Sequence, residues 1–162
     1  MDVLEAIRTN RAVRQFADRP VPDDVIREIV NAGRRAQSSK NDQPWHFIVV
    51  RDRDTLKQLS ECGKYAGHLA GAAFAVALIA SPGYDFDQGQ AAAYLQLAAW
   101  EQGIGSCIAS IYEPERARAI LGVPSDQQFD TAISFGYPAQ PSAAPRPGGR
   151  KPFDEVVRWE NW

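Results

Sequence analysis

The sequence predicts a single domain in which helices alternate with short buried strands, and three observations lead to that prediction. The chain has 162 residues, which is the size of one ordinary domain. Its hydrophobic content of 44% and charged content of 23% are typical of a globular protein. Apolar residues recur with the helical period in some segments and form short unbroken runs in others.

Helix signals mark five segments, through capping residues, prolines or acids at the start and glycines at the end. Gly33 interrupts the apolar stripe of one of them, which predicts that another backbone or a ligand approaches closely there. The small residues of the longest helix permit tight packing against another helix, including one of a second subunit. The predicted helices are a short one after Asp2, one from Pro22 to about Ala36, and those over 54–60, 87–102 and 114–121.

Strand signals mark four runs that are rich in β-branched and aromatic residues or wholly apolar. The run 72–80 is apolar throughout, which predicts a strand buried on both faces. The predicted strands are 46–50, 72–80, 106–111 and 129–135.

The chain changes character after residue 138. Residues 139–152 are rich in proline, glycine and basic side chains and show no periodicity, which predicts an extended arm. The following residues, 153–159, resemble a strand, and the chain carries Trp159 and Trp162 there. We expect the arm to be anchored by this ending, and it is long enough to reach a neighbouring subunit.

Charge and cysteine content limit the classes of function. A net charge of −2 gives no support to a nucleic-acid partner, which would require a basic excess. Cys62 and Cys107 lie far apart and in no metal-ligand spacing, so a reduced, cytoplasmic protein is expected. The N-terminus lacks the apolar core of an export signal, and the longest apolar run is shorter than the roughly 20 residues of a membrane helix.

Acid–base and nucleophilic motifs are lacking in the sequence. Neither a serine elbow nor HExxH, a P-loop or a Cys/His cluster is present. We expect structural roles for His46 and His68, and Gly103-Ile104-Gly105-Ser106 precedes a strand rather than a helix, unlike a dinucleotide fingerprint. The sequence therefore provides no catalytic side chain.

Two polar features suggest a ligand. The loop 38–45 carries hydroxyls, amides, a proline and a tryptophan, so it can present several donors while remaining rigid, although a well-made surface turn explains it equally. Arginines at positions 8, 11 and 14, and basic residues at 146, 150 and 151, can bind phosphate oxygens or simply be solvated.

These features occur in an order that resembles a known family. Arg11-Ala12-Val13-Arg14-Gln15-Phe16 resembles the Arg-Arg-Ser-x-Arg-x-Phe box of the nitroreductase family of FMN-dependent oxidoreductases. The residues 38–47 are similar to its Pro-Ser-Ser-x-Asn-x-Gln-Pro-Trp-x-Phe box, and 103–106 to its Gly-Leu-Gly-Ser/Thr segment. Later landmarks match at 114–124 and 135–138, and the basic C-terminal segment at 150–157.

The resemblance implies a fold and an assembly. The fold would be α+β, with a mostly antiparallel central sheet flanked by helices. The protein would be an intertwined homodimer that exchanges C-terminal arms, with residues 1–138 forming the FMN-binding domain and 139–162 the arm and anchor. FMN would lie at the dimer interface, so that each site uses both subunits.

The resemblance also assigns cofactor-binding positions. Arg11 and Arg14 would contact the phosphate or ribityl chain, with Arg150 as a C-terminal phosphate ligand. The backbone of Ser110 and Ile111 would face the flavin ring. The loop positions, which the partner subunit would contribute, are Gln37, Ser38, Ser39 and Asn41. Ala12 is the remaining position of the first box.

Departures from the family pattern predict weaker FMN binding. Asn10 and Ala12 stand where the family often has arginine and serine, and Gln37 stands where it has proline. Each lost charge-assisted hydrogen bond costs about 1.5–3 kcal/mol. Ser110-Ile111 also replaces a more usual pair containing glycine.

The implied activity is ping-pong transfer of hydride or electrons from NAD(P)H, through FMN, to a nitroaromatic, quinone or similar small-molecule acceptor. A non-catalytic flavin store and a dedicated flavin enzyme such as a reductive dehalogenase are the alternatives. Because only residues 81–88 separate the second strand from the long helix, no large lid is expected and the site should be open. Lys40 is a candidate for tuning substrate charge, although a solvated lysine is the simpler interpretation.

Overall fold

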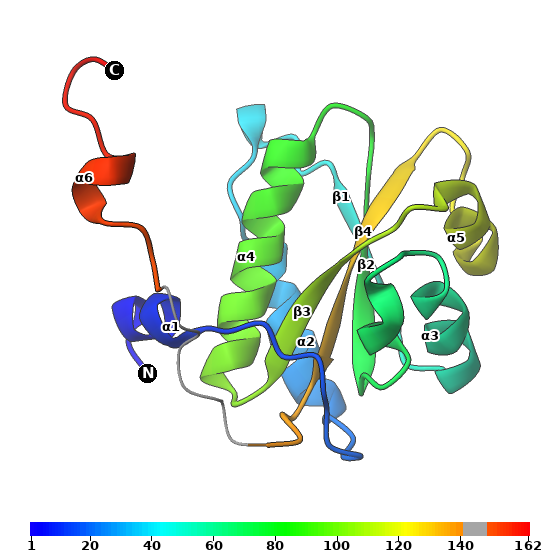
Figure 1. The fold of residues 1–162 in the computed structure, drawn as a ribbon. Coiled ribbons are helices and arrows are strands. Elements are labelled where there is room, and N and C mark those ends of the chain that lie inside the picture. Colours follow the sequence, from blue (N-terminus) through cyan, green and yellow to red (C-terminus); the bar gives the residue numbers. More distant parts are fainter. Residues whose placement is uncertain (141–148) are drawn as a thin grey trace.

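The computed structural model describes residues 1–140 and 149–162 of the chain. At its centre is an antiparallel sheet (Figure 1). In the described residues the strand order is β1 (Trp45–Val50), β2 (Phe74–Ala80), β4 (Gln128–Gly136) and β3 (Gly105–Ser110). Each of the four predicted strands is confirmed, with its ends within two residues of the prediction.

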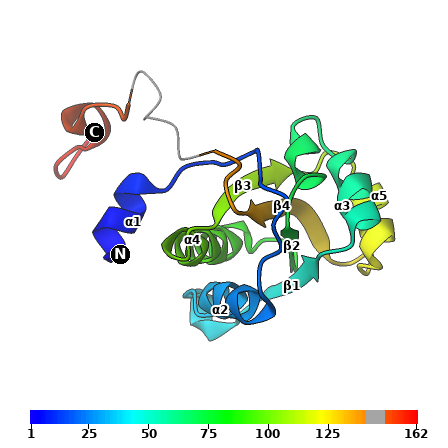
Figure 2. The ribbon, with the colours of Figure 1, turned by 90° about the horizontal axis from the view of Figure 1, so that it is seen from below.

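Helices cover both faces of the sheet (Figure 2). On one face lie α2 (Asp23–Gly33) and α4 (Asp85–Glu101). On the other lie α3 (Arg53–Ser60), α5 (Pro114–Leu121) and a short 3-10 helix, η2 (Ala66–Leu69). This arrangement confirms the α+β fold with an antiparallel sheet.

Strand β2 shows how the sequence specifies two cores. Its side chains alternate between the faces of the sheet, as in any strand. Because helices cover both faces of the sheet, the residues on either side of the strand are buried, and an unbroken apolar run suits both cores. Phe74 belongs to the core under α2 and α4 and stacks on Phe135 of β4, with ring centroids 4.8 Å apart. The neighbouring Ala75 belongs to the opposite core, under α3 and α5.

A close approach does occur at Gly33, where α2 crosses α4, but the neighbour is a side chain rather than the backbone or ligand that was predicted. A Cβ at Gly33 would lie 2.6 Å from the Leu95 side chain of α4. We expect Gly33→Ala to lower the free energy of unfolding by about 1–3 kcal/mol, because Leu95 must leave its place in a packed core. Urea unfolding followed by circular dichroism would measure this effect.

Gly89→Ala is the matched control, since a Cβ at this other helical glycine meets no atom within 4 Å. It should raise stability by about 0.5–1 kcal/mol through helix propensity. Equal effects of the two substitutions would show that α2 and α4 do not pack as described.

The N-terminal segment is held against the end of the sheet. After α1 (Val3–Thr9), which Asp2 caps, the chain runs beside β3: Ala12 bridges Ser106, and Val13 N donates to Ser106 O over 2.9 Å. A Cβ at Gly105 would lie 2.5 Å from Val13, so only glycine permits this approach. This contact between the N-terminal segment and β3 fixes the backbone next to Arg14.

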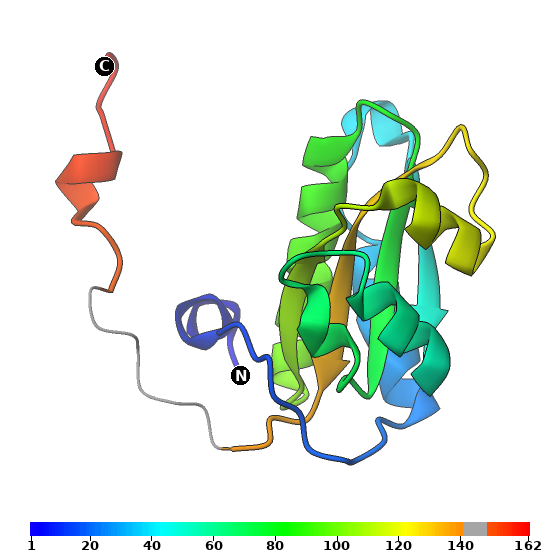
Figure 3. The same ribbon diagram turned by 45° about the vertical axis from the view of Figure 1, so that its right-hand side comes forward.

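The C-terminal prediction of a strand is wrong. Residues after Pro152 form a short helix, α6 (Phe153–Val156), which stands away from the sheet (Figures 1 and 3). Three local features favour the helix: a proline before the first turn, acidic residues within that turn, and an ion pair of 2.9 Å between Lys151 and Glu155. They outweigh the β-branched Val156 and Val157, which suggested a strand. Most of the predicted arm, including Arg146, lies in 141–148, outside the described residues.

In the described part of the chain, no helix is both long and apolar enough to cross a membrane.

Candidate functional site

A groove of about 690 Å³ lies between α4 and β3. Its α4 wall is a stripe of residues that recur three and four apart and so share one side of the helix. Its opposite wall comes from β3, from the turn that follows it and from β4. The α4 stripe consists of Asp85, Gln88, Gly89, Ala92, Ala93 and Gln96, and the opposite wall includes Ile108, Ser110, Ile111, Tyr112 and Thr131.

The groove contains a buried polar group without a partner. Gln88 is 6% exposed, and its Nε2 atom has no hydrogen-bond partner among the described residues. Leaving such a donor unpaired costs about 1–3 kcal/mol. Further along the stripe, Gln96 is satisfied by a 3.1 Å bond to Ser106 Oγ. The Gln88 amide therefore provides a donor for a polar ligand in the groove.

The structure places Ser110 and Ile111 on the wall of this groove. Ile111 N donates to Asp130 O of β4 over 2.8 Å. Because hydrogen-bonded and non-bonded pairs alternate along an antiparallel ladder, the N–H and C=O of Ser110 point away from β4 toward the free edge of the sheet. The Ile111 N–H is thus used within the sheet, and contact of the Ser110 backbone with a ligand stays a prediction.

Arg11, Ala12 and Arg14 lie together at the other end of β3. The Arg11 guanidinium donates to the carbonyls of Arg8 and Asn10, at 3.0 and 2.9 Å, so it stabilises the exit from α1. Arg14 is exposed and has no acidic partner within 4 Å among the residues that the structure describes. Arg14 rather than Arg11 is therefore the available phosphate ligand, whereas Ala12 contributes backbone only.

His68 has a structural contact, in agreement with the role expected of it. Its Nδ1 is 2.7 Å from Ser134 Oγ, which donates to Cys107 O. Burial, followed by the positive charge of Arg14, lowers the pKa of His68 below its ordinary value of 6.5. His68 is therefore neutral in the folded protein near neutral pH.

This shift predicts a pH dependence of stability. Between the lowered pKa and 6.5 the unfolded chain binds more protons than the folded one, so His68 makes stability fall as the pH drops through this window. We expect the stability difference between the wild type and His68→Gln to shrink from pH 7.5 to pH 5.5 in urea unfolding. An unchanged or growing difference would contradict a neutral, half-buried His68.

The loop after α2 is rigid and strained. Its 3-10 helix η1 (Ser39–Asn41) is closed by Gln43 N, which donates to Ser38 Oγ over 2.9 Å. Lys40, Asn41 and Gln43 have positive φ angles of 50°, 60° and 48°. Three non-glycine residues in this region within one loop are unusual, and such strain concentrates at functional sites.

This loop contacts α4 on the side facing away from the groove. Ser39 N donates to the buried Asp87 carboxylate over 3.2 Å, and Gln90 Nε2 donates to Gln37 O over 3.3 Å. Successive residues turn about 100° around a helix axis, so Asp87 and Gln90 point away from the α4 stripe. One chain consequently does not bring the loop and the groove together.

Arg150 also lies apart from the groove. It is exposed on the C-terminal segment that stands away from the sheet (Figure 3). Within one chain the structure therefore places the first arginine box at one end of β3 and Ser110 and Ile111 at the other, and it brings neither the loop positions nor Arg150 to the groove.

Several groove residues were missed by the sequence analysis. Gln88 and Gln96 are the clearest, because glutamines eight residues apart on an alanine-rich helix share one side. That spacing is a signal that the sequence contained. The exposed Ile108 and Tyr112 carry no comparable signal, since only the strand pairing shows which way they point.

The chain is similar to proteins of one known family. The model of the nitroreductase family matches residues 7–77 and 63–137. The chain belongs to the nitroreductase family. As a member of that family, it is an oxidoreductase.

Relatives cover nearly the full length of the chain. A proposed NADH dehydrogenase/NAD(P)H nitroreductase of Archaeoglobus fulgidus is 37% identical over 149 residues, covering 85% of this chain and 86% of the relative. An NADH dehydrogenase of Thermus thermophilus is 30% identical over 200 residues, covering 98% and 96%. The structure of an FMN-dependent nitroreductase from Clostridium difficile superimposes with a TM-score of 0.89 at 28% identity, covering 99% of this chain and all of the other.

The residues present fit FMN. The unpaired Gln88 amide, the outward-facing Ser110 backbone and the free Arg14 guanidinium supply donors for a long ligand that is polar at one edge and anionic at one end. A guanidinium matches phosphate geometry, and the alanines and glycine of the α4 stripe leave room for a flat ring.

Proposed function

We propose that this protein is a homodimeric flavin oxidoreductase that passes reducing equivalents from NAD(P)H to nitroaromatic compounds, quinones or similar small acceptors. The observation that carries this proposal is the groove beside β3. It is open, with small or apolar residues at its middle, and its polar lining residues are Asp85, Gln88, Gln96, Ser110, Tyr112, Asp130 and Thr131. Such a site suits a flat conjugated ring and flat aromatic acceptors better than a single elaborate substrate.

Bound FMN supplies the redox chemistry in this proposal. The chain holds and orients: Arg14 binds the phosphate, and the Ser110 and Ile111 backbone faces the ring edge. The Ser38, Ser39 and Asn41 loop of the partner subunit completes the site. No side chain has to transfer a proton, which agrees with the lack of an acid–base constellation.

Exposed apolar residues support the dimer. On α1, Val3, Leu4 and Ile7 are exposed, Leu4 to 78%, although they form an apolar face. On the C-terminal segment, which we propose as the dimer anchor, Phe153 and Trp159 are exposed as well. Apolar surfaces of this kind mark protein interfaces. We propose that a second copy covers these residues and contributes its loop to the groove.

The short connection between β2 and α4 supports broad specificity. Only residues 81–84 separate these elements, so this connection is too short to form a lid over the groove. NAD(P)H and the acceptor would then use the same open face in turn. This order predicts ping-pong kinetics, seen as parallel lines in double-reciprocal plots.

The visible spectrum of the purified protein and steady-state assays test the proposal. We expect flavin absorption, and oxidation of NADH or NADPH that depends on menadione or nitrofurazone. Protein that is loaded with FMN but does not turn over with either acceptor would contradict the proposed activity. Protein that binds no FMN would contradict the proposed site.

A further inference from the structure

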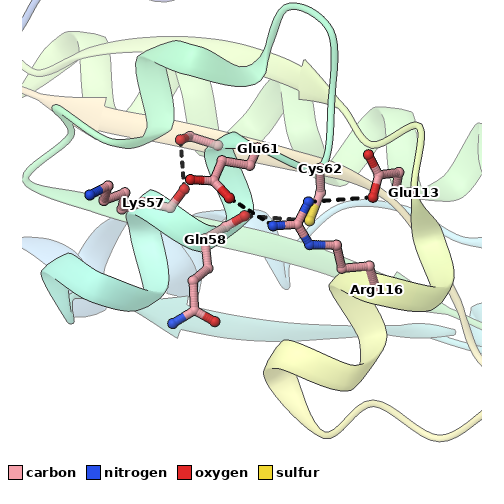
Figure 4. A network of polar contacts seen from close by, with 7 residues as sticks. Lys57, Gln58, Glu61, Cys62, Glu113 and Arg116 are labelled. Atoms are coloured by element: carbon pink, nitrogen blue, oxygen red, sulfur yellow. Dashed lines mark hydrogen bonds and ion pairs between the residues drawn. The ribbon is translucent and has the colours of Figure 1, made fainter.

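A network of polar contacts joins the end of α3 to the start of α5 (Figure 4). Glu61, Cys62 and Gly63 follow α3, whereas Glu113 and Arg116 belong to the start of α5. We call these five residues the Cys62 clamp. None of them lines the groove, but the segment that they hold does.

The backbone of Cys62 holds the turn after β3. Its carbonyl accepts from Tyr112 N over 2.8 Å and from Glu113 N over 3.0 Å. Both bonds come from the side of the turn opposite to the groove. The Cys62 side chain is fully buried, and its thiol donates to Gln58 O over 3.4 Å. This anchors the accepting carbonyl to α3.

Arg116 closes the clamp from the side. Its guanidinium donates to Glu61 Oε2 over 2.7 Å and to Glu113 Oε2 over 3.4 Å (Figure 4). One side chain thus bridges the residue that ends α3 and the residue that precedes α5. An exposed ion pair contributes little to global stability, so the consequence of this bridge is local: it fixes the spacing of the two segments.

Gly63 allows the two backbones to touch. A Cβ at this position would lie 2.2 Å from Ser110 O and 3.3 Å from Ser110 C, both backbone atoms. Such a contact cannot be relieved by rotating a side chain. Any residue other than glycine at position 63 must therefore displace Ser110.

The same short segment is thus fixed from behind and exposed in front. Ser110 contacts Gly63, Ile111 bonds β4 through Asp130, and Tyr112 bonds Cys62. The front of Ser110, Ile111 and Tyr112 lines the groove. A backbone N–H that must meet a ligand within a few tenths of an ångström requires this kind of support.

We propose that the Cys62 clamp positions the backbone N–H of Ser110 against the flavin ring, with Gly63 and Arg116 as positioning residues, while the Ile111 N–H holds the same segment to β4. The inference rests on the proposed FMN site and adds residues that touch neither cofactor nor substrate. It assigns a functional reason to a glycine and an arginine that are remote from the first arginine box and from the loop.

Two substitutions with matched controls test the proposal. Gly63→Ala pushes on Ser110, and Gly67→Ala is its control, because a Cβ at Gly67 meets nothing within 4 Å. Arg116→Met opens the clamp. Its control is Arg118→Met, which removes an ion pair to Glu115 and a 3.5 Å hydrogen bond to Gln127 O but none of the clamp contacts. If Gly63→Ala does not fold, Arg116→Met still tests the proposal.

The readouts separate positioning from stability. We measure the dissociation constant for FMN by fluorescence titration, the midpoint potential of bound FMN, and amide hydrogen exchange around residue 112 in the protein without FMN. Both clamp variants should bind FMN about twofold to tenfold more weakly, the range for one lost hydrogen bond. Their potential should be more negative, because a donor aimed at the ring stabilises the added charge of the reduced form. Exchange at Tyr112 and Glu113 should be faster, and both controls should match the wild type.

Wild-type affinity and potential in a folded Gly63→Ala or Arg116→Met protein would overturn the positioning role. A weaker affinity with an unchanged potential would overturn it as well, since loss of stability alone explains that result. Failure of the proposed FMN site has a different signature: the wild type itself would not bind FMN, and Arg14→Ala would change nothing.

Discussion

The double substitution Leu4→Glu and Ile7→Glu is expected to give a monomer that no longer holds FMN. Both side chains lie on the exposed apolar face of α1, and burying two carboxylates in an interface costs several kcal/mol. Helix α1 lies outside both cores of the sheet, so the monomer should remain folded. Light scattering after gel filtration, far-UV circular dichroism and flavin absorbance measure the three properties.

Comparison variants make this prediction specific. Glu5→Gln changes a residue of the same helix outside the apolar face and should leave both the dimer and FMN in place. Ser39→Ala keeps the dimer and removes one exposed hydroxyl, so it should weaken FMN binding without abolishing it. A monomer that retains FMN with wild-type affinity would show that one chain forms the whole site.

Arg14→Ala is expected to have the second largest effect, a loss of about tenfold to a hundredfold in FMN affinity. The substitution removes one charge-assisted interaction with the phosphate, worth about 1.5–3 kcal/mol. Arg14 is exposed and holds no element of the fold together, so thermal stability without FMN should change little. Fluorescence titration with FMN, and with riboflavin, which lacks the phosphate, measures the effect.

Riboflavin should bind the variant and the wild type equally, because only the phosphate contact is lost. Arg27→Ala is the control for charge, since it removes an arginine from the exposed side of α2. An equal loss for riboflavin, or wild-type FMN affinity in Arg14→Ala, would contradict the phosphate site.

The sequence predicted the strands well because helices cover both faces of the sheet. A run such as β2, which is short and apolar throughout, is typical of a buried strand. Gly122 follows α5 and Gly136 ends β4, as expected. The C-terminal error has a related cause. Val156 and Val157 suggested a strand, but no second strand of the described chain pairs with them, and the local signals of Pro152 and Asp154 decide for a helix.

The site could be predicted only where it is encoded locally. Arg14 and the Ser38–Asn41 loop belong to contiguous boxes, so their residues were identified. Tyr112 depends on how β3 pairs with β4, and Gly63 depends on a contact with Ser110, 47 residues away. The loop and the groove lie on opposite sides of α4. This separation follows from tertiary packing, which a local sequence pattern does not predict.

A mixed dimer tests the central claim, that each FMN site takes Arg14 from one chain and the Ser39 loop from the other. Arg14→Ala and Ser39→Asp chains are co-expressed with different tags, and the mixed dimer is purified through both. Each variant alone should retain little FMN. If the site is shared, the mixed dimer has one intact site and one doubly damaged site, and absorbance should show one FMN per dimer. A mixed dimer as empty as its parents would show that Arg14 and the loop act within the same chain.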